Sequence, residues 1–257
     1  MSETGSAAAR LIRESVGAEK VQATLDERGY GSVLTRNKWA DGQLLVFMYA
    51  KNQAALVENI QKNYPSIVSR IRERELTRIE ATTYAVNGTN KGLQERVQDV
   101  MQVDMRIPAG FVEALYEEKD KVMWLRRETD KASYNVLLQR LPYRASEQFS
   151  RDTFLRVQNE LGRRYISTTV ANTYMRVNDV DLPLYTKIMD INGKYALEAR
   201  GIWDIVNDFM GGPFITYLIL DEARNEVLVA NAFIHAPGEK KRDLQQSMEI
   251  MLQSIKL

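Results

Sequence analysis

The stretch that most constrains the fold of this chain spans residues 192–214. It opens with an Asn-Gly step at 192–193, continues as an alternating strand pattern, and ends in a Gly-Gly-Pro turn at 211–213. An Asn-Gly step between two strand-like runs is a strong signal for a β-hairpin, because both turn residues need a positive φ. We therefore predict antiparallel strands over 184–191 and 194–206.

Strand-like and helical patterns alternate through the rest of the second half. Apolar residues recur at helical spacing in two segments, at 150–165 and 239–255, and the first of these has Ser150 as its N-cap. This order predicts an α+β fold, an antiparallel sheet covered by helices in an α/β/α sandwich-like arrangement. The further strands that we predict cover 122–127, 134–141, 213–220 and 226–235.

The first half of the chain reads differently. Residues 1–103 form a helix-rich region with one buried strand, since the continuous apolar run at 43–50 has strand length. We expect a loop at 30–41 and a break or kink at Pro65, because a proline disfavours helical geometry in the residue before it. The second domain is expected to cover 104–257 as an α+β unit with an antiparallel meander.

Composition excludes several classes of function. The 257 residues carry 35 basic and 34 acidic side chains, which argues against a dedicated nucleic-acid binder. There is no cysteine, so disulfides, thiolate metal sites and cysteine nucleophiles are excluded. His235 is the only histidine, and we expect it to have a structural role at a strand end. We expect no cofactor, no metal and no catalytic residue.

Four segments carry a resemblance to a known family. They are VMWLRRET at 122–129, LPY at 141–143, NGKYALEARGIWDIVNDFMGGPF at 192–214 and FIHAPGEKKRDLQQSMEIMLQSIKL at 233–257. The chain resembles domain-of-unknown-function family 4837, a group of envelope lipoproteins of Bacteroidota, over roughly residues 37–257. The order of elements in the second half is also similar to the PsbP/Mog1-like α/β/α class, which is a purely architectural similarity.

The resemblance implies a cellular setting. It places the protein in the bacterial envelope, as a periplasm-facing or outer-membrane lipoprotein with a protein partner. Members of the family begin with a signal peptide and a lipid-modified cysteine, and this sequence shows neither. Membrane association is therefore expected only through a lipid anchor that is absent from this chain, which by itself is expected to be soluble.

Candidate ligand- or partner-binding residues lie in the strand at 194–206 and in the loop after it. Residues 198 and 200 point to the same side of the sheet, and the loop has little side-chain bulk, so a partner could approach closely. The competing interpretations are an ion pair, a core tryptophan and a tight turn in which at least one glycine has positive φ. The candidates are Glu198, Arg200, Trp203, Asp208, Gly211 and Gly212.

Three hypotheses on function follow. The first is a non-catalytic binding or assembly module, for which a shallow apolar patch flanked by polar residues would be evidence. The second is a carboxylate-dependent hydrolase, which needs Glu198 and Asp208 together in a cleft with a strongly raised pKa on one of them. The third is a small-ligand carrier, which needs an enclosed apolar pocket between helix and sheet.

Overall fold

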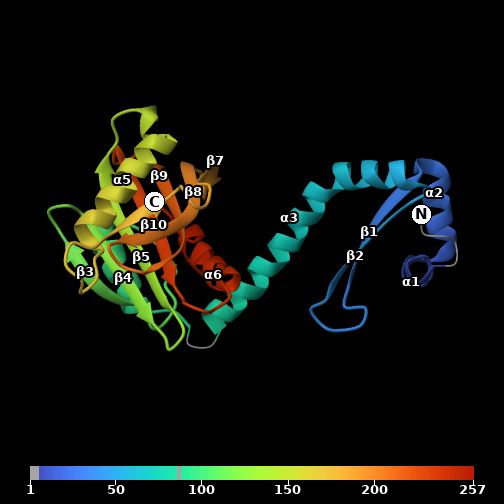
Figure 1. Cartoon of the computed structure of the whole chain (residues 1–257), viewed down its shortest axis with the longest axis horizontal. Coiled ribbons are helices and arrows are strands. Elements are labelled where there is room, and N and C mark those ends of the chain that lie inside the picture. Colours follow the sequence, from blue (N-terminus) through green and yellow to red (C-terminus); the bar gives the residue numbers. More distant parts are fainter. Residues whose placement is uncertain (1–5, 86–87) are drawn as a thin grey trace. The chain divides into compact units, whose positions relative to one another are not determined.

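A computed structural model describes residues 6–85 and 88–257 and divides the chain into two compact units, Met1–Thr77 and Arg78–Leu257. The division falls inside one long helix, α3 (Gln53–Ala85), earlier in the chain than the boundary expected before residue 104. Figure 1 shows the elements of both units.

The first unit contains two helices, a two-stranded sheet and most of α3. Helices α1 (Ala7–Val16) and α2 (Ala18–Arg28) are separated at Gly17, and β2 (Leu44–Ala50) is the strand expected at 43–50. The loop expected at 30–41 is wrong over its first half, because β1 (Tyr30–Arg36) pairs with β2 along its whole length.

Gly31 explains part of the wrong loop prediction, because this glycine lies in strand β1 and not in a turn. A Cβ at this position would lie 2.5 Å from the ring of Tyr49, so the glycine makes room for the tyrosine directly across the hairpin. A glycine in a strand thus marks a close approach here and not a loop.

Helix α3 continues through Pro65 without a break. Figure 1 shows that the helix bends along its length, so of the two outcomes expected at the proline the break is wrong and a bend is seen. Hydrogen bonds to the hairpin and within the helix hold the turns that precede the proline. Asn59 is completely buried and donates to the Gly31 carbonyl at 2.9 Å, and Asn63 donates to the Asn59 side chain at 2.9 Å. Pro65 itself is exposed, so water can reach the backbone carbonyl that the proline leaves without a donor.

The second unit is an antiparallel sheet with helices on both faces, which confirms the predicted α+β class. Among the described residues the sheet has eight strands in the order β3-β4-β5-β10-β9-β8, with β6 and β7 both paired to β8. Its elements are α4 (Lys91–Met101), β3 (Val112–Glu117), β4 (Val122–Glu128), β5 (Ser133–Pro142), the short 3-10 helix η1 (Ser146–Phe149), α5 (Arg151–Tyr165), β6 (Tyr174–Asn178), β7 (Tyr185–Ile191), β8 (Lys194–Val206), β9 (Gly211–Asp221), β10 (Glu226–His235) and α6 (Lys241–Gln253).

The hairpin between β7 and β8 is formed as predicted. Asn192 and Gly193 have φ values of 49° and 83°, so both adopt the left-handed conformation that the turn requires. The predicted N-cap of α5 is also present, because the Ser150 hydroxyl accepts from the backbone N–H of Thr153. Two strands were not predicted, β3 and β6, and both are short strands at the margins of the sheet.

The two faces of this sheet have separate cores. Helices α4 and α6 cover one face, where Val97, Met251 and Tyr217 lie in one apolar cluster. Helix α5 covers the other face, where Phe154 lies in a second cluster with Trp203. The helices predicted near 151–165 and 239–255 therefore pack on the sheet, one on each side (Figure 1).

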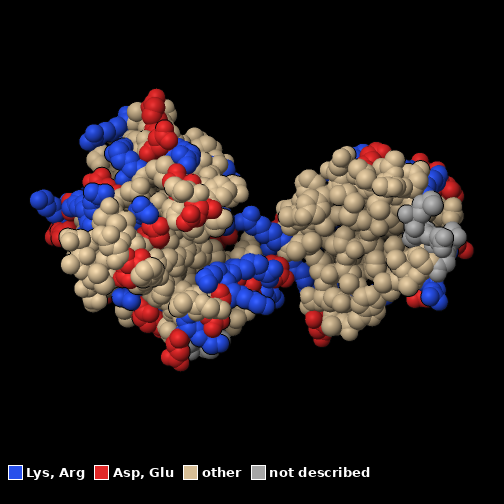
Figure 2. Space-filling view, viewed as in Figure 1, with Lys and Arg blue, Asp and Glu red and all other residues tan. Residues whose placement is uncertain are grey.

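Charged side chains are spread differently over the two units. On the face seen in Figure 2, Lys, Arg, Asp and Glu alternate over the second unit, whereas they stand at the margin of the first unit. Within the residues that the structure describes, no helix is long and apolar enough to cross a membrane.

Candidate functional site

Glu198 and Arg200 lie on the α6 face of the sheet and belong to a buried ion cluster. Arg200 donates twice to Glu198, at 2.8 Å each, and also binds Glu249 of α6 at 2.6 and 2.9 Å. Lys187 lies 3.2 Å from Glu198, and the Tyr217 hydroxyl donates to it at 3.2 Å. Each charge in this cluster has an opposite charge beside it.

The pKa shifts of Glu198 and Arg200 favour the ionised form of both side chains. Burial raises the pKa of Glu198, but the hydrogen bonds and charges of Arg200 and Lys187 outweigh burial and hold it below its usual value. Burial lowers the pKa of Arg200, but the bonds to Glu198 and Glu249 outweigh it and leave it raised. This cluster therefore joins α6 to the middle of β8.

A second ion cluster lies on the same face. Arg140 is almost completely buried and donates to Asp221 at 2.9 Å and to Glu226 at 3.0 Å. It also donates to the backbone carbonyls of Met101 and Gln102, at the C-terminal end of α4. This arginine attaches α4 to the sheet as Arg200 attaches α6.

Trp203 points to the opposite face, into the core beneath α5. It is 3% exposed, and its ring meets Phe233 edge-on with centroids 5.5 Å apart. The ring of His235 lies 6.2 Å away, and His235 Nδ1 lies 3.4 Å from the carbonyl oxygen of Gly211. These contacts support the interpretation of Trp203 as a core residue.

The positive φ expected at Gly211 or Gly212 is wrong. Neither residue has positive φ, and both belong to β9, where Gly212 pairs with Trp203. The glycines are required by close backbone approach. A Cβ on Gly212 would lie 1.9 Å from the carbonyl oxygen of Ile234, and one on Gly211 would lie 2.8 Å from that of Trp203. The left-handed residue of this turn is Asn207, with φ 63°.

Asp208 lies in the exposed loop after β8. A hydrogen bond from Thr168 and one from the Phe209 N–H lower its pKa. The eight steps along the strand from Glu198 to its end at Val206 span roughly 26 Å at about 3.3 Å per residue. Glu198 and Asp208 are therefore not brought together, and both have lowered pKa values, which is not the arrangement that the hydrolase hypothesis needs.

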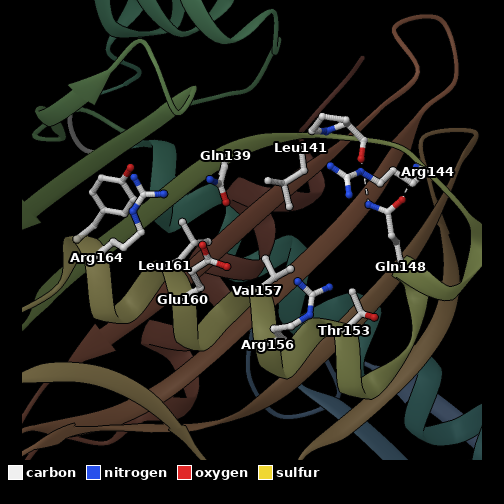
Figure 3. Close-up of a pocket in the computed structure, with 12 residues that line it drawn as sticks. Gln139, Leu141, Arg144, Gln148, Thr153, Arg156, Val157, Glu160, Leu161 and Arg164 are labelled. Carbon is white, nitrogen blue, oxygen red and sulfur yellow. Dashed lines mark hydrogen bonds between the residues drawn. The ribbon is translucent and has the colours of Figure 1, made fainter.

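A groove on the other side of the sheet combines an apolar floor with basic side chains. It has a volume of about 230 Å³ and lies between β5, the segment that follows it, and α5 (Figure 3). We call it the α5 groove. Its apolar floor consists of Leu141, Val157 and Leu161. The polar side chains that line it are Gln139, Arg144, Gln148, Thr153, Arg156, Glu160, Arg164 and Tyr165.

Three arginines and one glutamate give the α5 groove a positive rim. Arg164 is paired with Asp120, which also accepts from the Tyr165 hydroxyl at 2.7 Å. Burial and this bond to Asp120 raise the pKa of Tyr165 to about 12, so the hydroxyl stays a donor. Among the described residues, no hydrogen bond or ion pair is made by the guanidinium groups of Arg144 and Arg156.

Local hydrogen bonds fix the segment that carries Arg144. The Gln148 side chain accepts from the backbone N–H groups of Arg144 and Ala145, and donates to the carbonyl of Pro142 at 3.1 Å. The chain therefore turns tightly through η1 and places Arg144 opposite Arg156, as Figure 3 shows. The groove is a stable feature of the fold and does not depend on a long unsupported loop.

Sequence reasoning did not select these residues. Arg144 and Arg156 are separated by a turn and a cap, so only the folded chain brings them to one groove. One signal was present: α5 carries four arginines against two acidic residues, an excess on a chain with nearly balanced charge. Among the described residues, no group of three or more His, Cys, Asp or Glu is placed to hold a metal ion.

Comparison with known proteins identifies the family. A family model, "Domain of unknown function (DUF4837)", matches residues 90–254. The chain belongs to this family. The match lies within the second compact unit, and the DUF4837 part therefore contains the whole sheet, both ion clusters and the α5 groove. No curated protein matches the chain.

Solved structures that are similar to the DUF4837 chain include two of Mog1 proteins. One is the Ran-binding protein Mog1p of Saccharomyces cerevisiae, with 9% identity and a TM-score of 0.37 over 60% of this chain and 89% of that one. The other is a mutant of protein Mog1, with 10% identity and a TM-score of 0.36 over the same shares of the two chains. These neighbours are of the Mog1-like class to which the second half was compared.

Proposed function

We propose that the DUF4837 unit is a protein-binding module, and that its α5 groove takes a partner segment with an apolar side chain next to an acidic one. The observation that carries this proposal is a pair of guanidinium groups, on Arg144 and Arg156, that have no acidic partner in the described chain and flank an apolar floor. An arginine binds a carboxylate through two parallel hydrogen bonds, which gives both affinity and orientation.

The size of the α5 groove favours a partner side chain over a carried ligand. Pockets for small molecules usually measure about 300–1,000 Å³. The groove has about 230 Å³, which suits one or two anchoring side chains. A shallow apolar patch with polar flanks is also the feature expected of a binding module, whereas a carrier needs an enclosed pocket.

The setting proposed for this module is the bacterial envelope, as the resemblance to envelope lipoproteins implies. Its partner is then a protein exposed in the same compartment. The loop that contains Asp208 is the alternative contact surface, because Phe209 next to it is fully exposed. The test below separates the two surfaces.

A random peptide library displayed on phage, panned against the full chain, tests the groove without a known partner. We expect enriched peptides to combine an apolar anchor with Asp or Glu, and to shift the NMR signals of Leu141, Val157 and Leu161. The double variant R144E/R156E should lose this binding at least tenfold. The control R126E/R163E makes the same change of charge on exposed arginines outside the groove and should bind normally.

Three results would overturn the proposal. Peptides without an acidic bias would remove the role of the arginines. Equal losses in both double variants would show a general charge effect. Signals that shift around Asp208 and Phe209, and not in the groove, would move the contact to the loop.

A further inference from the structure

The first unit leaves an apolar stripe on α3 exposed to solvent. Its five members are exposed by 40–58% and lie between residues 57 and 71 of the helix. They are Val57, Ile60, Tyr64, Val68 and Ile71. We call them the α3 stripe.

The α3 stripe is narrow and uncharged. At about 100° per residue, its five members fall within about 80° of the helix circumference. The hairpin contacts a different side of α3, where Asn59 and Asn63 are held, so the unit's own elements do not cover the stripe. A continuous apolar stripe of four turns on a surface helix is typical of an interaction surface.

The spacing of the stripe points to one kind of partner. Successive members are 3, 4, 4 and 3 residues apart, a series that reads the same in both directions around Tyr64. We propose that a second copy of this chain binds the stripe, with the two α3 helices antiparallel. A two-fold axis beside Tyr64 then places Val57 opposite Ile71 and Ile60 opposite Val68, so every apolar residue meets another.

The contact is expected to be weak. A stable dimer buries about 800 Å² on each partner, and five half-exposed side chains on one helix supply less than this. We therefore expect mostly monomer at about 1 μM and substantial dimer at several hundred μM, as for a dissociation constant on the order of 100 μM. This inference is independent of the α5 groove, which lies in the other unit.

The absence of cysteine makes the geometry testable on the full chain, because any single introduced cysteine is unique. At high concentration under mild oxidation, Tyr64→Cys should form a disulfide-linked dimer. Val57→Cys and Ile71→Cys should each crosslink poorly alone and well when mixed. Sedimentation of the unmodified chain should show dimer forming with concentration. Ile60→Glu should abolish it, and Lys62→Glu, exposed on another side of α3, should not.

Other outcomes overturn the inference. A sedimentation coefficient that does not change with concentration excludes self-association. Strong crosslinking of Val57→Cys with itself shows a parallel arrangement. Slow maleimide labelling of Val57→Cys and Ile71→Cys in the monomer shows that the chain itself covers the stripe.

Discussion

The two faces of the large sheet bury their polar groups in different ways. On the α6 face, charges are buried together, in the cluster of Arg200 and in that of Arg140. On the α5 face, the buried polar contacts are neutral, as between Thr216 and Asn231 at 3.0 Å, and the arginines stay at the rim. The charges of the α6 face are already paired with one another, so this face, within the described residues, has no free charge to bind a charged partner. The arginines at the rim of the α5 face can bind a partner's acidic side chain.

Among the substitutions considered, the largest loss of stability is expected in the aromatic core beneath α5. Trp203→Ala should destabilise the fold by about 3–5 kcal/mol, because it leaves a large cavity beside Phe233. Urea denaturation measures this change. A loss below about 1 kcal/mol would mean that the tryptophan is not a core residue in solution.

On the opposite face, Arg200→Gln should cost about 3 kcal/mol, because it leaves the carboxylates of Glu198 and Glu249 without their shared cation. Denaturation of the single variant and of the triple variant with Glu198→Gln and Glu249→Gln provides the comparison. The triple variant should regain part of the stability. If the triple variant is the less stable one, the carboxylates do not depend on Arg200.

Gly212→Ala tests the close approach of β9 and β10. The added methyl group would lie 1.9 Å from the Ile234 carbonyl, so the strands must separate locally, at a cost of about 1–3 kcal/mol. Gly193→Ala is the contrasting variant, since its cost comes from positive φ in open space. Faster amide exchange around Ile234 in Gly212→Ala alone would support the distinction.

The ionised face should also make stability depend on pH. Burial raises the pKa of Glu226, but Lys121 and Arg140 outweigh it, so Glu226, like Glu198, has a lowered pKa in the folded chain. Such groups contribute stability that is complete above their unfolded pKa, about 4.3, and is lost as pH falls through the folded value. Stability measured from pH 7 to pH 3 should fall below about pH 4.5, and less steeply in Arg200→Gln.

The smallest change in stability is expected for a substitution in the α5 groove. Arg156→Gln should change stability by less than about 0.5 kcal/mol, because the exposed guanidinium has no partner among the described residues. Thermal denaturation beside the peptide-binding assay separates folding from binding. A large loss of stability would show that Arg156 belongs to the fold and would weaken its proposed role.

Local patterns predicted the second unit well. The Asn-Gly hairpin, the Ser150 cap and the apolar stripes of α5 and α6 all depend on residues that are close in sequence. Each is decided by geometry within a few residues, so one sequence suffices. The family and the α+β class followed from the same segments.

What failed depends on contacts between distant residues. Glycines in a sequence suggest turns, but Gly31 and Gly212 lie in strands. Each leaves room for a group from a distant part of the chain, the ring of Tyr49 at Gly31 and the carbonyl of Ile234 at Gly212. Glu198 and Arg200 look like a pair, but Glu249, 49 residues beyond Arg200, completes them. The α5 groove was not predicted for the same reason, because Arg144 and Arg156 line one groove only once η1 and α5 have folded.

The pairing of strand β8 helps to protect the edge of this sheet from aggregation. Its outer side is shared, with β7 pairing up to Arg200 and β6 pairing from Ile202, so the outermost backbone is broken into two short strands. Gly201 lies where the pairing changes, and the outer strand β3 at the other margin carries a bulge between Glu113 and Leu115. An unpaired edge recruits strands from other molecules only where it is long and regular. Both margins of this sheet are interrupted, which protects an extensively hydrogen-bonded protein from open-ended assembly through its edges.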